Sequence, residues 1–433
     1  MQRLLELQAN QIEQVLWRNN IAAQVIGGDV LPRLTTFHLT VSNDQGDVLA
    51  RVQRLASTLA LRLDVSGEVR IARHGAKIVI QVPHGQFRPM YLLRLQQEVE
   101  AAAQPVPTQT MLLGLDEDGR PLFLNLTAPD VAHALVAGTT GSGKSSLMLA
   151  MALSLAINNR PDRTRLVLID PKGRQFSTLA GLPHLLAGVV TGVDSASRAA
   201  GALAVMEKLL LEMERRDRAG VSLPHIFVFI DELADLMLVG GPPFRAALTR
   251  LTQRGRGAGI HVVAGTQKPT VEVIGSLVKA NFPTRIVGAV ASPEDAKVAA
   301  GVRDTGAETL AGKGDFLLIA GGLKIRFQAG YVPPEAIPQV VAHLAAGEAS
   351  PAGRRWDITS GEPAETTTLG GRLRKLIPFP LVGQRGGHNR SDPPQAVADA
   401  QAGMSAWQLR LKYGFGGSKA ERLVREYGPK ATG

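Results

Sequence analysis

A chain of 433 residues is long enough for about two to four domains. Its 45% hydrophobic and 20% charged residues are typical of a globular protein and exclude a largely disordered one. The absence of cysteine excludes disulfides and thiolate metal sites. A formal net charge of +10 indicates a polyanionic partner, nucleic acid first and a membrane surface second.

Residues 1–20 place apolar side chains on one face of a helix: Leu4, Leu5, Ile12, Val15 and Leu16. Such a helix is more often a docking or oligomer-contact element than a membrane anchor. The sequence has no apolar run long enough to span a bilayer and no signal peptide, so we expect a cytoplasmic protein without a transmembrane segment.

Residues 21–104 are interpreted as a small α+β domain. Thr35–Val41 alternates like a strand, Val48–Leu63 keeps its apolar residues on one helical face, and residues 69–71 and 77–82 form a hairpin. The histidines of this domain are too scattered for a metal site. Nothing in it indicates catalysis.

Strands alternate with helices between residues 105 and 345, which favours an α/β domain with a parallel sheet covered on both faces. The predicted strands are continuous apolar runs: His133–Ala137, Arg165–Ile169, Ile226–Ile230, Ile260–Gly265, Thr284–Val290 and Asp315–Ala320. Ligands in such a sheet bind at the carboxyl ends of the strands. This rule selects the residues that follow four of the strands: Gly138, Asp170, Asp231 with Glu232, and Thr266 with Gln267.

The segment from Gly138 to Ser145 has the pattern GxxxxGK[ST] after an apolar strand and before a helix. This is a phosphate-binding loop, whose glycines let backbone N–H groups face the phosphates at the positive end of the helix. Lys144 is expected to neutralise the β- and γ-phosphates, and the Ser145 hydroxyl to hold Mg²⁺. The predicted ligands are ATP and Mg²⁺, and the nucleotide-binding residues are Gly138, Thr139, Thr140, Gly141, Ser142, Gly143, Lys144, Ser145 and Ser146.

Two carboxylates follow the apolar strand Ile226–Ile230. Asp231 is expected to order the Mg²⁺ shell, and Glu232 to polarise the attacking water as general base. This pair favours hydrolysis of ATP over simple nucleotide storage. Gln267, at the end of the next strand, is placed to hydrogen-bond the γ-phosphate or the water and so to sense the nucleotide.

Basic residues occur in two further places. Arg254 and Arg256 precede the strand at Ile260, where Arg256 could stabilise transition-state charge across a subunit boundary; a solvated basic loop explains both residues equally well. Beyond a flexible linker at residues 346–402, residues 403–433 predict a helix-turn-helix with six basic residues against two acidic ones. This segment either binds DNA or docks on protein. Its candidate DNA contacts are Arg410, Lys412, Lys419, Arg422 and Arg425.

With these residues the chain resembles the FtsK/SpoIIIE family of DNA-translocating ATPases. The matching motifs occur in the family's order over about 200 residues. They are the phosphate loop, Leu168–Lys172, Leu182–Leu186, Glu212–Arg216, Phe229–Met237, Ala258–His261, Gly265–Pro269 and Ile274–Ile286. Lys268 stands where the family more usually has arginine.

The resemblance implies a RecA-like motor domain at residues 105–345, preceded by a small α domain and followed by a winged-helix domain. It implies a homo-hexameric ring around double-stranded DNA, in which Arg256 acts in trans and Lys144, Asp231, Glu232 and Gln267 have the roles given above. The membrane-spanning region that precedes the motor in the divisome members has no counterpart in this sequence, so the resemblance is to a soluble form.

Three functions are therefore open. The first is an ATP-driven translocase of double-stranded DNA, acting in DNA segregation or plasmid transfer, with a possible membrane or recombinase partner. The second is a secretion- or conjugation-coupling ATPase that moves protein or nucleoprotein. The third is a non-motor DNA-binding protein of plasmid replication or partition.

Overall fold

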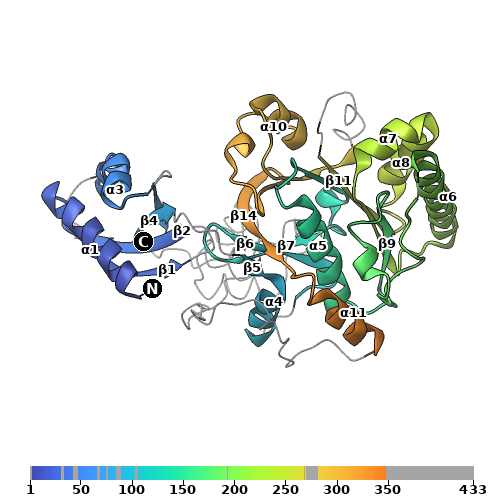
Figure 1. The fold of residues 1–433 in the computed structure, drawn as a ribbon, viewed down its shortest axis with the longest axis horizontal. Helices are drawn as coiled ribbons and strands as arrows, with labels where there is room; N and C mark the ends of the chain where they lie inside the picture. The colour runs from blue at the N-terminus through green and yellow to red at the C-terminus, as the bar shows by residue number, and fades with distance from the viewer. Residues whose placement is uncertain are drawn as a thin grey trace, which may run out of the picture. The chain divides into compact units, whose positions relative to one another are not determined.

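Two units make up the computed structural model, the first ending at Met90 and the second beginning at Tyr91 (Figure 1). The structure describes residues 2–30, 34–41, 47–65, 69–74, 77–83, 89–102, 106–192, 194–267, 269 and 281–347. The predicted helix-turn-helix, and the predicted linker beyond Gly347, lie outside the described residues. Within these ranges, no helix combines the length and apolar character needed to cross a membrane.

The first unit is a four-stranded antiparallel sheet with helices packed against it. Its strands run in the order β1-β2-β4-β3. Its elements are α1 (Gln2–Arg18), β1 (Ala23–Val30), β2 (Leu34–Val41), α2 (Val48–Gln53), α3 (Ala56–Arg62), β3 (Arg70–His74) and β4 (Lys77–Pro83). Ile12 and Leu16 of α1 are fully buried with Phe37 and Ile80 of the sheet. The apolar face of α1 is therefore occupied by its own unit.

The second unit is built on a ten-stranded mixed sheet. The strand order is β7-β6-β14-β13-β12-β8-β11-β10-β9, and β5 (Met90–Tyr91) pairs with β14. The strands are β6 (Thr110–Asp116), β7 (Pro121–Asn125), β8 (Ala134–Ala137), β9 (Thr164–Ile169), β10 (His225–Ile230), β11 (Ile260–Thr266), β12 (Thr284–Val287), β13 (Asp315–Ala320) and β14 (Leu323–Tyr331). The run β9-β10-β11-β8-β12 is parallel, and the pairings from β12 to β7 are antiparallel.

Helices cover this sheet. They are α4 (Leu92–Ala101), α5 (Lys144–Asn158), α6 (Ser195–Ala219), α7 (Leu233–Val239), α8 (Gly241–Arg254), α10 (Pro293–Ala300) and α11 (Ile337–Ala345), with short 3₁₀ turns at Pro129–Val131, Ser177–Leu179 and Ala307–Thr309. The helices α6, α7 and α8 gather together in Figure 1 and share one apolar core with β9, β10 and β11. Helix α5 packs against β6, β8, β11 and β14 and is buried along most of its length, which fixes the start of α5 relative to the sheet.

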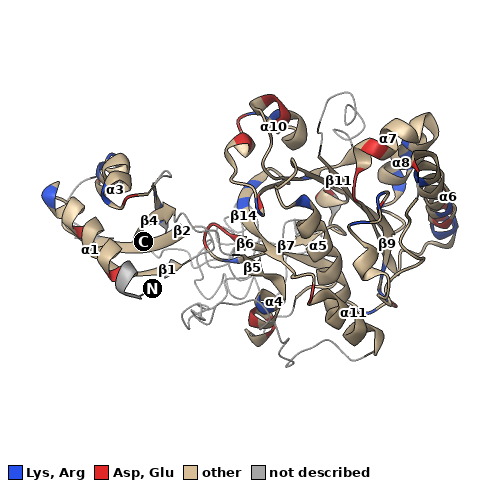
Figure 2. Cartoon of the chain, viewed as in Figure 1, with Lys and Arg blue, Asp and Glu red and all other residues tan. Residues whose placement is uncertain are grey.

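Charged side chains lie mainly outside these cores. Figure 2 shows blue and red residues side by side on α6 and blue residues on α8, whereas the central sheet is largely tan. Arg250 pairs with Glu214, and Arg254 pairs with Asp217 at 2.7 Å. Because these pairs are partly exposed, each stabilises the fold by about 1 kcal/mol at most.

All six strands predicted from apolar runs are present, and five of them are parallel as expected. The direction of β13 was predicted wrongly, because Asp315–Ala320 pairs with β12 in antiparallel orientation. An apolar run has the same pattern in either direction when both faces are buried, so the pattern carries no information on direction. The single helix expected over Val48–Leu63 is two helices, with Asp47 capping the first through its side chain.

Three histidines cluster at the amino ends of the parallel strands. The His261 Nδ1 lies 3.1 Å from the Ala132 oxygen, and its Nε2 lies 3.2 Å from the His225 Nδ1. The His133 Nδ1 accepts a hydrogen bond from the Val262 N–H at 3.0 Å. Burial lowers the pKa of His133 to about 4 and that of His261 to about 3. These rings are therefore neutral at ordinary pH.

Acidification below pH 6.5 should destabilise the protein through this cluster. The unfolded chain takes up a proton on His133 near its ordinary pKa of 6.5, whereas the folded state does so only near pH 4, so stability is lost as pH falls through this window. The expected loss from His133 alone at about pH 5 is on the order of 2 kcal/mol. Urea unfolding at neutral pH and at about pH 5 measures it.

The matched variant is His133→Gln, which should lose less stability than the wild type between the two pH values. Taking the difference between the two proteins cancels other titrating groups, including carboxylates with raised pKa values that act in the opposite direction. An equal loss of stability in both proteins would show that protonation of His133 does not contribute to the pH dependence.

Candidate functional site

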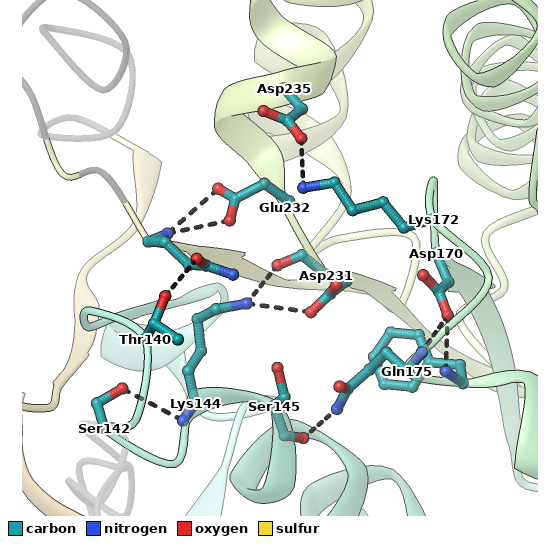
Figure 3. Close-up of polar contacts among 12 residues, drawn as sticks. Thr140, Ser142, Lys144, Ser145, Asp170, Lys172, Gln175, Asp231, Glu232 and Asp235 are labelled. Atoms are coloured by element: carbon teal, nitrogen blue, oxygen red, sulfur yellow. Dashed lines mark hydrogen bonds and ion pairs between the residues drawn. The ribbon is translucent and has the colours of Figure 1, made fainter. Parts of the chain in front are cut away.

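The carboxyl ends of four parallel strands meet at one edge of the sheet. The phosphate loop follows β8, Asp170 follows β9, Asp231 and Glu232 follow β10, and Gln267 follows β11. Figure 3 shows Asp231 and Glu232 above Lys144 and Ser145 at the start of α5, with Asp170 to one side. The sheet thus brings together groups that lie far apart in the sequence.

The phosphate loop has a backbone that requires glycine. Gly141 and Gly143 have φ angles of +85° and +95°, in the left-handed region that other residues rarely adopt. A Cβ at Gly138 would lie 2.6 Å from the Ser142 Oγ. Helix α5 begins directly after Gly143, so its positive end faces the space that the loop encloses.

Lys144 extends from the first turn of α5 toward the end of β10. Its side chain is only 3% exposed, and its ammonium group donates to the Asp231 main-chain oxygen at 2.7 Å and to the Asp231 Oδ1 at 3.0 Å. The lysine is thereby fixed at the position where a phosphate would compete with Asp231 for it.

Glu232 is buried beside this pair. Both of its carboxylate oxygens accept from the Gln267 N–H, at 3.2 and 3.1 Å. Burial raises the pKa of Glu232, while the charge of Lys144 and hydrogen bonds from Thr266 and Gln267 act against that rise. A buried carboxylate with a raised pKa is a stronger proton acceptor than an exposed one, as a general base requires.

Gln267 joins the end of β11 to the phosphate loop. Its side-chain oxygen accepts a hydrogen bond from the Thr140 hydroxyl at 3.1 Å, while its main-chain N–H binds Glu232. One residue therefore contacts both the predicted base and the predicted phosphate-binding segment. This geometry suits the sensor role that the sequence predicted.

A match to a known protein family covers all of these site residues. Residues 92–222 and 213–271 match the FtsK/SpoIIIE family. This chain carries an FtsK/SpoIIIE-family domain.

Relatives of this domain are longer than the present chain. A DNA translocase FtsK of Leptospira interrogans is 35% identical over 356 residues, which cover 77% of this chain and 37% of the relative. One of Staphylococcus epidermidis is 33% identical over 364 residues, covering 77% and 44%. The chain thus spans less than half the length of these relatives.

A more distant likeness exists among solved structures. The cytoplasmic domain of the Thermomonospora curvata type VII secretion ATPase EccC is 26% identical, with 56% of this chain and 32% of that chain covered and a TM-score of 0.49. A likeness at this level does not bear on function.

Asp170 shapes a loop of the FtsK/SpoIIIE domain that closes one side of the site. Its buried Oδ2 accepts hydrogen bonds from the N–H groups of Gln175 and Phe176, at 2.6 and 2.8 Å. The Gln175 side chain in turn donates to the Ser145 main-chain oxygen. The sequence pointed to Asp170 but not to Gln175, because a loop glutamine carries no pattern of its own.

A second lysine–aspartate pair lies over Glu232. The Lys172 Nζ is 2.9 Å from the Asp235 Oδ2, and this hydrogen bond raises the pKa of Lys172. The two side chains are 44% and 50% exposed. The pair is therefore far more solvated than that of Lys144 with Asp231.

Arg256 does not join the site within one chain. It is exposed in the loop before β11, at the amino ends of the strands, whereas Gln267 follows the carboxyl end of the same strand. A seven-residue strand separates the two by about 23 Å. Lys268 and the predicted DNA contacts of residues 403–433 lie outside the described residues.

Removing the buried lysine should cost more stability than removing the exposed one. Lys144→Met leaves the Asp231 carboxylate buried without its cation, and should lower the free energy of unfolding of the nucleotide-free protein by about 3 kcal/mol. Lys172→Met breaks an exposed pair and should lower it by less than about 1 kcal/mol. Urea denaturation of the two variants measures both.

A second substitution separates charge from packing. Asp231→Asn added to Lys144→Met removes the uncompensated carboxylate and should recover part of the lost stability. If the two lysine variants were equally stable, burial would not distinguish the pairs and this account of Lys144 would be wrong.

Proposed function

We propose that this chain is an ATP-driven translocase of double-stranded DNA, built on a RecA-like motor. The observation that carries the proposal is the convergence of Lys144, Asp231 and Glu232 at one sheet edge, inside a domain of the FtsK/SpoIIIE family. The relatives that cover most of this chain are DNA translocases by name.

The nucleotide would occupy the phosphate loop, with its γ-phosphate between Lys144 and Glu232. Lys144 exchanges its bonds to Asp231 for phosphate oxygens, and Glu232 accepts a proton from the water that attacks the γ-phosphorus. Gln267 transmits the presence of the γ-phosphate to Thr140 and to β11.

The residues present fit a magnesium ion. The Ser145 side chain points toward Asp231 in Figure 3, and a hydroxyl together with a carboxylate matches the oxygen ligands that Mg²⁺ prefers beside nucleotide phosphates. Ser145 and Asp231 would hold the ion, which when bound neutralises charge on the phosphate oxygens.

Assembly into a ring, a homo-hexamer in this proposal, would give Arg256 a role. Its exposed position at the amino edge of the sheet keeps it from its own chain's phosphate loop but leaves it accessible to a neighbouring subunit. A guanidinium delivered in trans would stabilise charge as the γ-phosphate is transferred.

The C-terminal segment would contact DNA. Residues 351–433 hold 13 lysines and arginines against 7 aspartates and glutamates, so more than half of the net charge of +10 lies there. Arg410, Lys412, Lys419, Arg422 and Arg425 would bind phosphates, and a membrane protein or a recombinase is a possible further partner.

A secretion- or conjugation-coupling ATPase would use the same phosphate chemistry on another cargo. The polymer that stimulates hydrolysis separates it from a DNA translocase. A non-motor DNA-binding protein would bind DNA without turnover.

Long double-stranded DNA should stimulate ATP hydrolysis several-fold, and Glu232→Gln should abolish the stimulated rate. The amide cannot accept the proton of the attacking water, so the rate should fall by at least about 100-fold while nucleotide binding persists. Steady-state phosphate release with and without DNA measures both effects.

Asp235→Asn is the matched control, because it makes the same carboxylate-to-amide change three residues away and breaks only an exposed pair. It should retain most of the stimulated rate. Hydrolysis indifferent to DNA would support the secretion-type function instead, and DNA binding without any hydrolysis would support the non-motor protein.

DNA affinity should depend steeply on salt. Release of counterions from contacted phosphates predicts a loss of about a thousandfold between low and moderate salt. Arg422→Ala should weaken binding and reduce the salt slope by about one, whereas Arg62→Ala in the first unit should leave the slope unchanged. A nearly salt-independent affinity would refute the electrostatic part of the proposal.

A further inference from the structure

Two carbonyl groups of the phosphate loop are held by a segment from the antiparallel half of the sheet. The Lys313 N–H donates to the Gly141 oxygen at 2.9 Å, and the Gly314 N–H donates to the Ser142 oxygen at 2.8 Å. A loop whose N–H groups face phosphate turns carbonyls away from it, and those carbonyls need donors. Residues 311–314, which we term the donor loop, supply them.

Glycines make this close approach possible. A Cβ at Gly143 would lie 2.7 Å from the Gly314 nitrogen, and a Cβ at Gly312 would lie 3.1 Å from the Gly141 oxygen. Gly312 and Gly314 also have left-handed φ angles of +69° and +89°. The two loops therefore contact each other through their backbones, and the position of one constrains the other.

The donor loop is itself held by side chains at the base of β13 and β14. Asp315 is 1% exposed, and its Oδ2 accepts from the Ala311 N–H at 3.0 Å. Arg326 donates to both Asp315 oxygens, at 2.9 and 2.8 Å, and Gln328 donates to the Lys313 oxygen at 3.1 Å. A two-pronged guanidinium–carboxylate bond fixes orientation as well as distance.

We propose that Asp315, Arg326 and Gln328 are positioning residues for the triphosphate site: they hold the donor loop, which holds the phosphate loop in its binding conformation. The inference rests on the proposed nucleotide binding at Lys144. It goes beyond nucleotide binding, because the affinity for phosphate then depends on side chains that act through the donor loop. Arg326 also lies 4.0 Å from Glu117 in the β6–β7 turn. The same chain of contacts therefore extends to the far strands of the sheet.

The decisive variants are Gln328→Met and Arg326→Met in the full-length protein. Gln328→Met nearly keeps the volume of the side chain and removes its hydrogen bond to the donor loop. Lys324→Met is the control, since it removes a positive charge from the exposed start of the same strand. The measurements are the melting temperature of the nucleotide-free protein, the Kd for a fluorescent ATP analogue with Mg²⁺, and the kcat and KM for ATP.

Gln328→Met should raise the Kd and the KM by about tenfold, the effect of losing one well-formed hydrogen bond, with kcat within about threefold of the wild type. Arg326→Met removes two hydrogen bonds and should raise the Kd and the KM by at least as much. Lys324→Met should change none of these. A merely structural role would lower the melting temperature and leave the Kd unchanged, and that result would overturn the proposal. If Arg326→Met does not fold, Gln328→Met decides alone.

Failure of the proposed function gives a different pattern. A wild-type protein that binds the analogue but is not stimulated by DNA would remove the translocase and leave the positioning residues in place. A wild-type protein that binds no nucleotide would overturn both.

Discussion

The bond between the Lys144 ammonium and Asp231 ties the first turn of α5 to the end of β10. A buried ammonium group must be compensated by an anion, and Asp231 supplies both its carboxylate and its main-chain oxygen. This requirement fixes the end of β10, and with it the position of Glu232, relative to the phosphate loop. A phosphate that displaced Asp231 from Lys144 would therefore also change the position of Glu232, the next residue in the chain.

Strand direction explains why the candidate site residues lie at one edge of the sheet. The parallel strands β8, β10 and β11 end together, so the residues that follow them lie at the same edge. The antiparallel strands contribute differently. The turn before β13 comes back to the same edge, and there it presents backbone N–H groups to the phosphate loop. The parallel half thus carries the candidate site side chains, and the antiparallel half holds the phosphate loop through its backbone.

The sequence predicted which of these side chains meet at one edge of the sheet, but not which segments hold them in place. Lys144, Asp231, Glu232 and Gln267 follow apolar strands, and the rule for parallel sheets places strand ends together regardless of loop length. Gln175 and the donor loop escaped prediction because their contacts use main-chain atoms, which leave no residue-type pattern. The sequence contains Gly312 and Gly314, but only the structure shows that they lie against the backbone of the phosphate loop. The direction of β13 was lost for a related reason, since burial on both faces removes the alternation that would have distinguished it.

The two edges of the parallel strands also differ in the ionisable groups they carry. At the carboxyl edge, the Lys144 cation lies beside the carboxylates of Asp231 and Glu232. At the amino edge, the exposed Arg256 and the buried Arg216 lie near histidines, and their positive charges help burial to lower the pKa of His261 and His225. Neutral imidazoles add no further positive charge beside Arg256. Glu212 pairs with Arg216 and Asp217 with Arg254, so this edge carries charges of both signs. In the proposed head-to-tail ring, Arg256 would reach a neighbour's triphosphate only where one subunit's amino edge meets the next subunit's carboxyl edge.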